Sequence, residues 1–283
     1  MRPVLTALLT VLIAGVGGFA LICVLLYFGQ ERSIFFPRPN DAQLRHRYSA
    51  QRIEIVTGRL ASADRGKSRG AAAGATLEGW WIENPQPTTQ AVVLYFGGNA
   101  EDVLYTAGEA SNIDARAVLV VNYRGYGGSS GEPGQQALYD DGLAIYDYAT
   151  KRGVAAEHIV VMGRSLGSGV ASMLAGVRPV RAAILITPFD SLASVAAGHY
   201  PFLPVRLLLR HPFPSTDWAQ RAQAPALIIA AERDFVVPAA RAQKLFEAWA
   251  GPKQIHVLPH MGHNDIDMHP DYYRLVNEFL HAL

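Results

Sequence analysis

Short apolar runs that alternate with helix-like segments constrain the fold of this 283-residue chain more than any other feature. The runs lie at residues 91–96, 117–122, 158–162, 182–186, 226–230 and 254–258. Each is too short for a helix and apolar on both faces, as expected of strands buried between two helical layers. Helix-like segments occupy residues 101–112, 135–151, 165–176, 239–250 and 271–281. This order predicts an α/β fold with a mostly parallel sheet and helices on both faces.

The region before residue 91 extends the predicted sheet to about eight strands. Residues 51–56 alternate polar and apolar side chains, as a half-buried strand does, and residues 76–83 form the next strand. Residues 59–75 are rich in Gly, Ala and charged residues. Because this segment has too little apolar area to order itself, we expect a flexible surface loop there.

An uncharged apolar stretch covers residues 4–28 and ends in Tyr27 and Phe28. About 20 apolar residues suffice for a helix to cross a bilayer. Aromatic residues are typical of its interfaces. A cleavable signal peptide has a shorter apolar region and a small-residue cleavage site. A lipoprotein signal would need a small residue just before Cys23, where Ile22 stands. A buried core helix is the remaining alternative, which the terminal position of the stretch disfavours.

We therefore predict a membrane anchor over residues 1–30, a juxtamembrane connector over 31–49 and a catalytic domain over 50–283. The orientation stays open, because arginines flank the anchor on both sides and large domains cross membranes largely regardless of such charges. The net charge is only +1 and 17% of residues are charged, which excludes the basic footprint of a nucleic-acid-binding protein. A single cysteine cannot form an intrachain disulfide.

The sequence Gly163-Arg164-Ser165-Leu166-Gly167 stands directly between a predicted strand and a predicted helix. This strand–turn–helix setting is that of a nucleophile elbow, in which the serine is exposed at a sharp turn. A serine hydroxyl needs a base to remove its proton. On this architecture the acid and then the histidine follow the serine, each just past a strand end. Asp234 and His263 meet both conditions, so Ser165, Asp234 and His263 are the predicted catalytic residues.

Other candidates for these roles are weaker. Asp190 lies one strand too early to be the acid, and Asp217 falls within the predicted cap. His260 precedes His263 by three residues and is the alternative base. The same tail, from His260 to His269, contains metal-capable side chains, but a zinc site needs three or four ligands and no second cluster supports one. We expect neither a metal nor a cofactor.

The oxyanion donors are predicted to be backbone N–H groups. One comes from Leu166, the residue after the nucleophile, and the other from the loop after the strand at 91–96. In that loop Asn99 N–H is the first choice and Gly98 the alternative. The glycine-rich loop 123–133 lacks the spacing of a dinucleotide fingerprint and is expected to pack near the site. Residues 190–221 are hydrophobic and proline-rich, which predicts a cap or lid and is equally compatible with a packed helix.

These motifs together resemble the α/β-hydrolase superfamily. The matching stretches include Gly98-Asn99-Ala100, residues 122–131, Gly163–Gly167, Asp234 with Val237-Pro238, and Gly262-His263-Asn264. More narrowly, the chain is similar to membrane-anchored serine hydrolases related to protein depalmitoylases. That branch commonly has His-Gly-Asn-Ala where this chain has Gly97-Gly98-Asn99-Ala100. The replacement of the histidine by Gly97 leaves the predicted triad unchanged and bears on the shape of the oxyanion loop. The hydrophobic cap and the expected proximity of the membrane indicate lipid-like or acylated-protein substrates.

The predicted function is hydrolysis of carboxylic esters or thioesters through a Ser-His-Asp triad and an acyl-enzyme. A membrane-tethered peptidase of the same fold is the enzymatic alternative, because the same triad cleaves amides. A non-catalytic scaffold is the alternative from another class, since a fold does not fix a function. The expected location is a single-pass anchor in a bacterial inner membrane, with the side of the catalytic domain left open.

Overall fold

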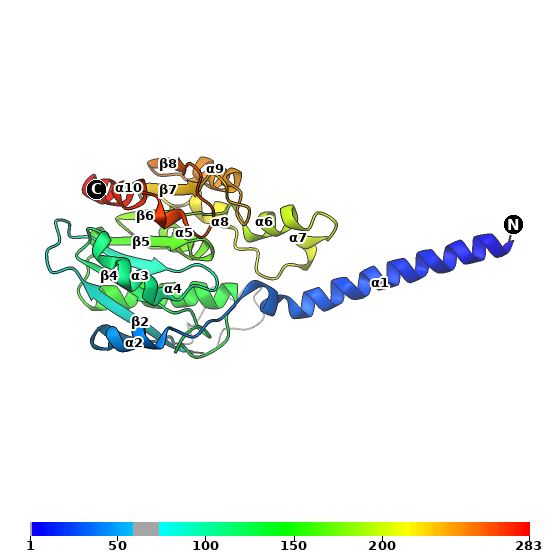
Figure 1. Cartoon of the computed structure of the whole chain (residues 1–283), viewed down its shortest axis with the longest axis horizontal. Helices are drawn as coiled ribbons and strands as arrows, with labels where there is room; N and C mark the ends of the chain where they lie inside the picture. Colours follow the sequence, from blue (N-terminus) through cyan, green and yellow to red (C-terminus); the bar gives the residue numbers. More distant parts are fainter. Residues whose placement is uncertain (1, 59–73) are drawn as a thin grey trace.

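A computed structural model describes residues 2–58 and 74–283, and its central feature is one twisted sheet (Figure 1). Over these residues the sheet has eight strands in the order β1-β2-β4-β3-β5-β6-β7-β8. β1 and β2 pair antiparallel, as do β2 and β4, and every later pair is parallel. This confirms the predicted mostly parallel sheet. The strands are β1 (Arg52–Val56), β2 (Thr76–Glu83), β3 (Val92–Phe96), β4 (Ala117–Val121), β5 (Ile159–Arg164), β6 (Ala182–Ile186), β7 (Ala226–Ala231) and β8 (Lys253–Leu258).

Helices cover both faces of the sheet, as the alternating sequence pattern predicts. Those over one face are α4 (Gln135–Lys151), α5 (Leu166–Val177), α8 (Ser215–Ala219) and α9 (Ala239–Ala248). Those over the other are α3 (Val103–Glu109), the short 3₁₀ turn η2 (Ala110–Asn112) and α10 (Asp271–His281). The single helix predicted at residues 101–112 is thus α3 followed by η2. Two further 3₁₀ turns, η3 (Ala156–His158) and η4 (Ile266–Met268), lie before β5 and α10.

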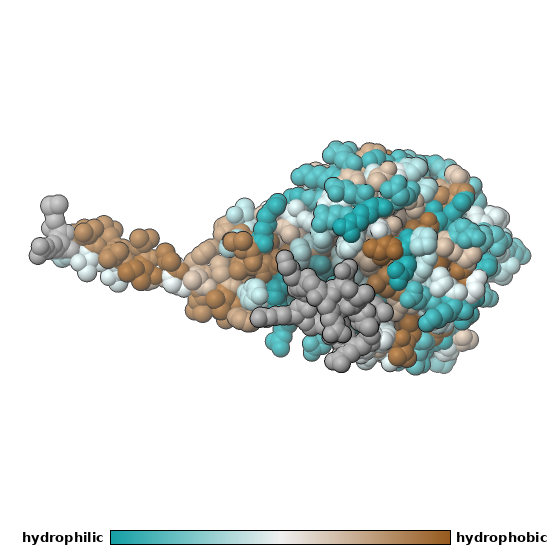
Figure 2. Space-filling model, turned by 180° about the vertical axis from the view of Figure 1, so that it is seen from behind, coloured by the Kyte–Doolittle hydropathy of each residue, from teal (hydrophilic) through white to brown (hydrophobic). Residues whose placement is uncertain are grey.

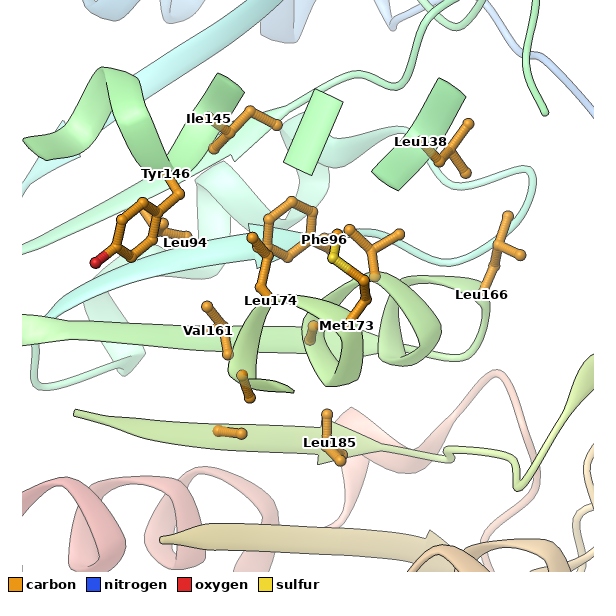
Figure 3. Close-up of a cluster of buried hydrophobic side chains, with 14 of the residues drawn as sticks. Leu94, Phe96, Leu138, Ile145, Tyr146, Val161, Leu166, Met173, Leu174 and Leu185 are labelled. Carbon is orange, nitrogen blue, oxygen red and sulfur yellow. The ribbon is translucent and has the colours of Figure 1, made fainter. Parts of the chain in front are cut away.

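The core consists of two layers because successive strand side chains point to opposite faces. In β3, Leu94 and Phe96 face α4 and α5, whereas Val93 and Tyr95 face α3 and α10. Figure 3 shows the first layer, where Leu94 and Phe96 meet Ile145 of α4 and Leu174 of α5. β8 is an edge strand with a largely exposed surface, so its apolar sequence run is only half-buried. The site described below lies at the carboxyl ends of these buried strands.

The amino-terminal helix α1 (Arg2–Ile34) extends away from the body of the molecule (Figure 1). It is long and apolar enough to cross a membrane, and its apolar window is not buried. It ends beyond residue 30, so the chain is still helical where we placed the start of an extended connector. A signal sequence would have the same length and composition. After α1 the chain reaches β1 through α2 (Ala42–Arg47) and the 3₁₀ turn η1 (Ser49–Gln51).

The segment predicted as a cap divides into two parts. α6 (Leu192–His199) and α7 (Val205–Leu208) lie beside the inner end of α1 (Figure 1), and α7 contacts it. α8 instead packs against α5 and α9 within the helical layer. The second half of the segment is thus the packed helix of the two alternatives, and the cap stays a prediction for the first half. The loop predicted at residues 59–75 falls mostly on 59–73, outside the described residues.

Candidate active site

Ser165 occupies the sharp turn between β5 and α5, with φ of 49° and ψ of −114°. A side chain at positive φ costs of order 1–3 kcal/mol, and such strain persists where the surrounding structure enforces it. The turn is tight enough that a Cβ on Gly163 would clash with the backbone of Gly167, and one on Gly167 with the carbonyl of Phe96. The two glycines of the motif are thus required by close backbone approach.

The structure brings together the three residues that the sequence predicted as catalytic. His263 Nε2 lies 2.8 Å from Ser165 Oγ, and His263 Nδ1 lies 2.7 Å from Asp234 Oδ2. The Asp234 carboxylate is buried, and its other oxygen accepts hydrogen bonds from Val236 N and Val237 N at 2.8 and 2.6 Å. These bonds fix the carboxylate, which in turn orients the imidazole toward the serine. The arrangement can move a proton from Ser165 to His263.

The alternative residues lie elsewhere. Asp190 is paired with Arg241 on α9, at 3.3 Å, and Asp217 is exposed on α8. His260 is exposed, and its Nδ1 lies 3.1 Å from the Arg233 guanidinium. Among residues 2–58 and 74–283, no three His, Cys, Asp or Glu side chains gather closely enough to hold a metal ion.

The loop between β3 and α3 faces the serine from the opposite side. Gly98 N–H donates a hydrogen bond of 2.6 Å to Glu101 Oε2, so this donor is already engaged within the loop. Within the described part of the chain, the N–H groups of Asn99 and Leu166 donate to no protein acceptor. Asn99 and Leu166 both line the space around Ser165. Of the two loop positions considered, Asn99 therefore offers the free donor.

Glu101 was not among the predicted site residues, although it holds the loop in which an oxyanion donor was predicted. Besides Gly98 N–H, its carboxylate accepts hydrogen bonds from Tyr95 Oη at 2.7 Å and Thr106 Oγ1 at 3.0 Å. Its charge also lies 3.7 Å from the guanidinium of Arg164. Burial by itself would lower the pKa of Arg164, but Glu101 and other nearby anionic groups raise it above its usual value. A carboxylate directly after Gly-Gly-Asn-Ala was the sequence signal for this role.

Two further residues, also missed at the sequence level, connect the site to its surroundings. Arg164, the residue before the serine, donates a hydrogen bond of 3.3 Å to the carbonyl of His263 and so links the histidine loop to Glu101. Tyr126, in the glycine-rich loop 123–133, donates a hydrogen bond of 2.7 Å to Asn99 Oδ1. The expectation that this loop packs near the site is correct.

Two cavities of different character meet at Ser165: one has charged as well as apolar side chains in its lining, and the other is lined mainly by apolar side chains. The polar cavity, about 640 Å³, lies on the side of Glu101, Arg164 and His263. Five carboxylates line it: Asp41, Glu101, Asp102, Glu109 and Asp267. The apolar cavity, about 430 Å³, lies between Ser165, the end of α1 and the cap helices α6 and α7. Its wall includes Leu26 and Ile34 of α1 together with Val195, Leu203 and Leu208. A ligand at Ser165 thus has a polar space on one side and an apolar space on the other.

Comparison with known proteins places this geometry in a family. Residues 91–215 match the alpha/beta hydrolase fold family. The chain is 39% identical over 198 residues to the uncharacterized protein Rv2307c of Mycobacterium tuberculosis, covering 69% of this chain and 70% of that protein. It is 28% identical to human alpha/beta hydrolase domain-containing protein 17B, covering 69% and 67%.

Among solved structures, the Pyrococcus furiosus esterase Pf2001 shares the fold. Its TM-score to this chain is 0.64 at 18% identity, over 87% of this chain and 95% of the esterase. At that identity the likeness concerns the fold alone, but it agrees with the sequence matches and with the strand order. The chain belongs to the α/β-hydrolase family, as its strand–turn–helix motif first indicated.

Proposed function

We propose that this chain is a membrane-anchored serine hydrolase that cleaves carboxylic esters or thioesters by acyl transfer. The observation that carries the proposal is the hydrogen-bonded series Ser165 Oγ, His263 Nε2, His263 Nδ1 and Asp234 Oδ2, with separations of 2.8 and 2.7 Å. These distances are those required for direct proton transfer. The strained elbow and the buried, doubly hydrogen-bonded carboxylate support the same assignment, because both keep the series in place.

In the proposed reaction, Ser165 Oγ attacks the carbonyl carbon and its proton moves to His263 Nε2. Asp234 holds the Nδ1–H tautomer and stabilises the imidazolium. The oxyanion receives hydrogen bonds from the N–H groups of Leu166 and Asn99. His263 then gives the proton to the departing alcohol or thiol as its bond to carbon breaks, leaving an acyl ester on Ser165. Water then attacks this ester while His263 takes its proton; the bond between the acyl carbon and Ser165 Oγ breaks, His263 returns the proton to Oγ, and the acid leaves.

Retention of α1 as an anchor is part of the proposal. A leader that is cleaved off is not expected to form specific contacts with the folded domain. Here Glu31 forms an ion pair with Arg210, and Asn99 Nδ2 donates a hydrogen bond of 2.6 Å to the Ile34 carbonyl. Contacts of this kind favour a helix that stays attached. The esterase named among the structural neighbours and the resemblance to depalmitoylase-like hydrolases agree with an ester or acylated substrate.

The test is turnover of p-nitrophenyl esters by the full chain and by Ser165→Ala. We expect Ser165→Ala to lower kcat by about 10⁴-fold or more, because loss of the nucleophile removes the acyl-enzyme route. Ser172→Ala is the matched control, since this buried hydroxyl on the same helix has no hydrogen-bond partner in the described structure. Its kcat should stay within about twofold of the unmodified protein.

Each alternative gives a different result. Full turnover by Ser165→Ala would remove Ser165 from the mechanism. An inert, correctly folded protein would indicate a scaffold, whereas Ser165-dependent cleavage of p-nitroanilides in preference to esters would indicate a peptidase.

A further inference from the structure

We infer that the carboxyl-terminal turns of α1 form one wall of the acyl-binding pocket, and that a long acyl chain reaches Ser165 from the bilayer between α1 and the cap helices. This inference rests on the proposed function, because it assigns the apolar cavity to the acyl part of the substrate. It makes α1 a component of substrate binding as well as a tether.

Gln30 lies at the contact between α1 and the cap. Its side chain is only 7% exposed, unlike the exposed residues that precede it. Its Nε2 donates to the Leu208 carbonyl at 3.1 Å, and its Oε1 accepts from Arg210 N at 2.7 Å. A buried amide with both ends hydrogen-bonded fixes the rotation of α1 relative to the cap, since any turn of the helix would leave polar groups unpaired.

Further contacts on either side of Gln30 hold the same arrangement. Glu31 pairs with Arg210 and also lies 3.3 Å from His211 Nε2. His211 packs against Phe35 with ring centroids 5.2 Å apart, and its Nδ1 accepts a hydrogen bond from Gln135 N. Burial, with a contribution from Arg210, lowers the pKa of His211 to about 4. The ring is therefore neutral at pH 7, which suits a nitrogen that accepts from an N–H.

The contact between α1 and the cap helices encloses the apolar cavity next to Ser165. Leu26, Gln30 and Ile34 recur at intervals of four residues, so they lie along one face of α1. All three line the apolar cavity, and the same cavity reaches Ser165 and Leu166. On the far side, Asn99 joins α1 to the oxyanion loop, because its Nδ2 donates to the Ile34 carbonyl and its Oδ1 accepts from Phe36 N. One side chain in the oxyanion loop thus contacts the end of α1 directly and couples the positions of the two segments.

The protein surface around the apolar cavity is rich in exposed apolar side chains. Exposed apolar side chains gather on the cap beside α1, including Phe202, which is 71% exposed, and Leu207, which is 85% exposed. Figure 2 shows apolar surface running along α1 and onto the adjoining end of the body. A patch continuous with a helix able to span a membrane fits a lipid surface, because a protein in water rarely exposes such a patch. Its chemistry matches a substrate whose acyl chain lies in the bilayer.

The experiment compares substitutions at two neighbouring residues of α1, of which only one lines the apolar cavity. Leu26 lines the apolar cavity, whereas Leu25 is 63% exposed and is not among the residues lining it. The full chain and its Leu26→Trp and Leu25→Trp variants are assayed in detergent with p-nitrophenyl laurate and p-nitrophenyl acetate. The readout is kcat/KM for laurate divided by kcat/KM for acetate, a ratio in which the active fraction cancels, and labelling by a fluorophosphonate checks that each variant is folded.

We expect Leu26→Trp to lower this ratio by about tenfold to a hundredfold, the effect of excluding two or three methylene groups from an apolar site. Leu25→Trp should leave the ratio within about twofold. Leu208→Trp, on the cap side of the same cavity, provides a second variant should Leu26→Trp fail to fold, and should lower the ratio likewise.

Two negative results can be told apart. Equal ratios in the unmodified protein, Leu26→Trp, Leu208→Trp and Leu25→Trp, with hydrolysis still dependent on Ser165, would overturn the inference and leave the proposed function standing. Absence of Ser165-dependent hydrolysis of either ester would overturn the proposed function itself.

Discussion

The two cavities at Ser165 are built from different parts of the chain. The polar cavity is lined mainly by loops at the carboxyl ends of the strands and by α3 and α10, and residues 38–41, which follow α1, complete its wall. Its five carboxylates outnumber its two arginines, Arg38 and Arg164, by three. The apolar cavity is lined mainly by α1, α6 and α7, which lie outside the sheet and its covering helices, and residues at the strand ends, such as Asn99 and Val237, close it beside Ser165. Ser165 thus stands between a cavity built mostly on the strand ends and a cavity built mostly on α1 and the helices beside it.

Because the two cavities are built from different elements, we expect some substitutions to affect the reaction itself and others to affect which substrate is preferred. Residues that belong to the strand ends should affect every substrate equally, because all substrates pass through the same tetrahedral intermediate. Residues of α1 and the cap should affect substrates according to their acyl chains, because only a long chain reaches them. Substitutions in each region therefore test whether the two halves of the site are independent.

The largest effect is expected from Asp234→Asn, which removes the charge that orients His263. An amide at this position favours the wrong imidazole tautomer, and the loss in a serine protease triad is about 10⁴-fold in kcat. Laurate and acetate esters should lose the same factor in steady-state assays. Asp190→Asn is the control, because Asp190 pairs with Arg241 instead of His263, and a similar loss in that variant would contradict the assignment of the acid.

A smaller effect, also common to all substrates, is expected at Glu101. Removing its carboxylate in Glu101→Ala frees Gly98 N–H and loosens the oxyanion loop, which should lower kcat by about tenfold to a hundredfold. KM should change little, since ground-state contacts are untouched. Glu101→Gln should restore most of the rate, because its amide oxygen still accepts from Gly98 N–H. Equal losses in both variants would indicate that the negative charge, and not the hydrogen bond, is what matters.

Gln30→Leu should separate the two halves of the site. It leaves Arg210 N–H and the Leu208 carbonyl without their partner, a loss of about 1–3 kcal/mol in the free energy of unfolding. The laurate-to-acetate ratio should fall as α1 loosens from the cap. Thr10→Leu is the matched control on the same helix, because the Thr10 hydroxyl bonds to the Thr6 carbonyl one turn away. An unchanged ratio in Gln30→Leu would show that the α1–cap contact does not shape the pocket.

The smallest effect is expected on the leaving-group side. An excess of negative charge in the polar cavity should favour cationic leaving groups through its electrostatic potential. Butyrylthiocholine should be cleaved about threefold to tenfold faster than S-butyryl-3-mercaptopropionate, after correction for their intrinsic hydrolysis. The preference should shrink at about 0.5 M salt, where such interactions are screened. A preference for the anionic thioester would show that Arg38 and Arg164 dominate this cavity.

Much of this molecule follows from local sequence patterns. The strands could be predicted because their apolar runs alternate with amphipathic segments, and Ser165, Asp234 and His263 could be located because each follows a strand end. What the sequence did not reveal depends on contacts between distant segments. Gln30 bonds to a carbonyl 178 residues away, and nothing near either residue marks the pairing. Glu101 was missed because its hydrogen bond to Gly98 N–H depends on how the backbone turns over residues 98–101.

Ser165 is the proposed nucleophile, and it lies at the junction of the two cavities. The most direct measurement is covalent labelling of the full chain with a long-chain alkyl fluorophosphonate, followed by peptide mass spectrometry to locate the adduct. We expect a single adduct on Ser165, absent in Ser165→Ala and strongly slowed in His263→Ala, because the serine must be deprotonated to attack. An adduct on another residue, or none on Ser165 in folded protein, would contradict the account.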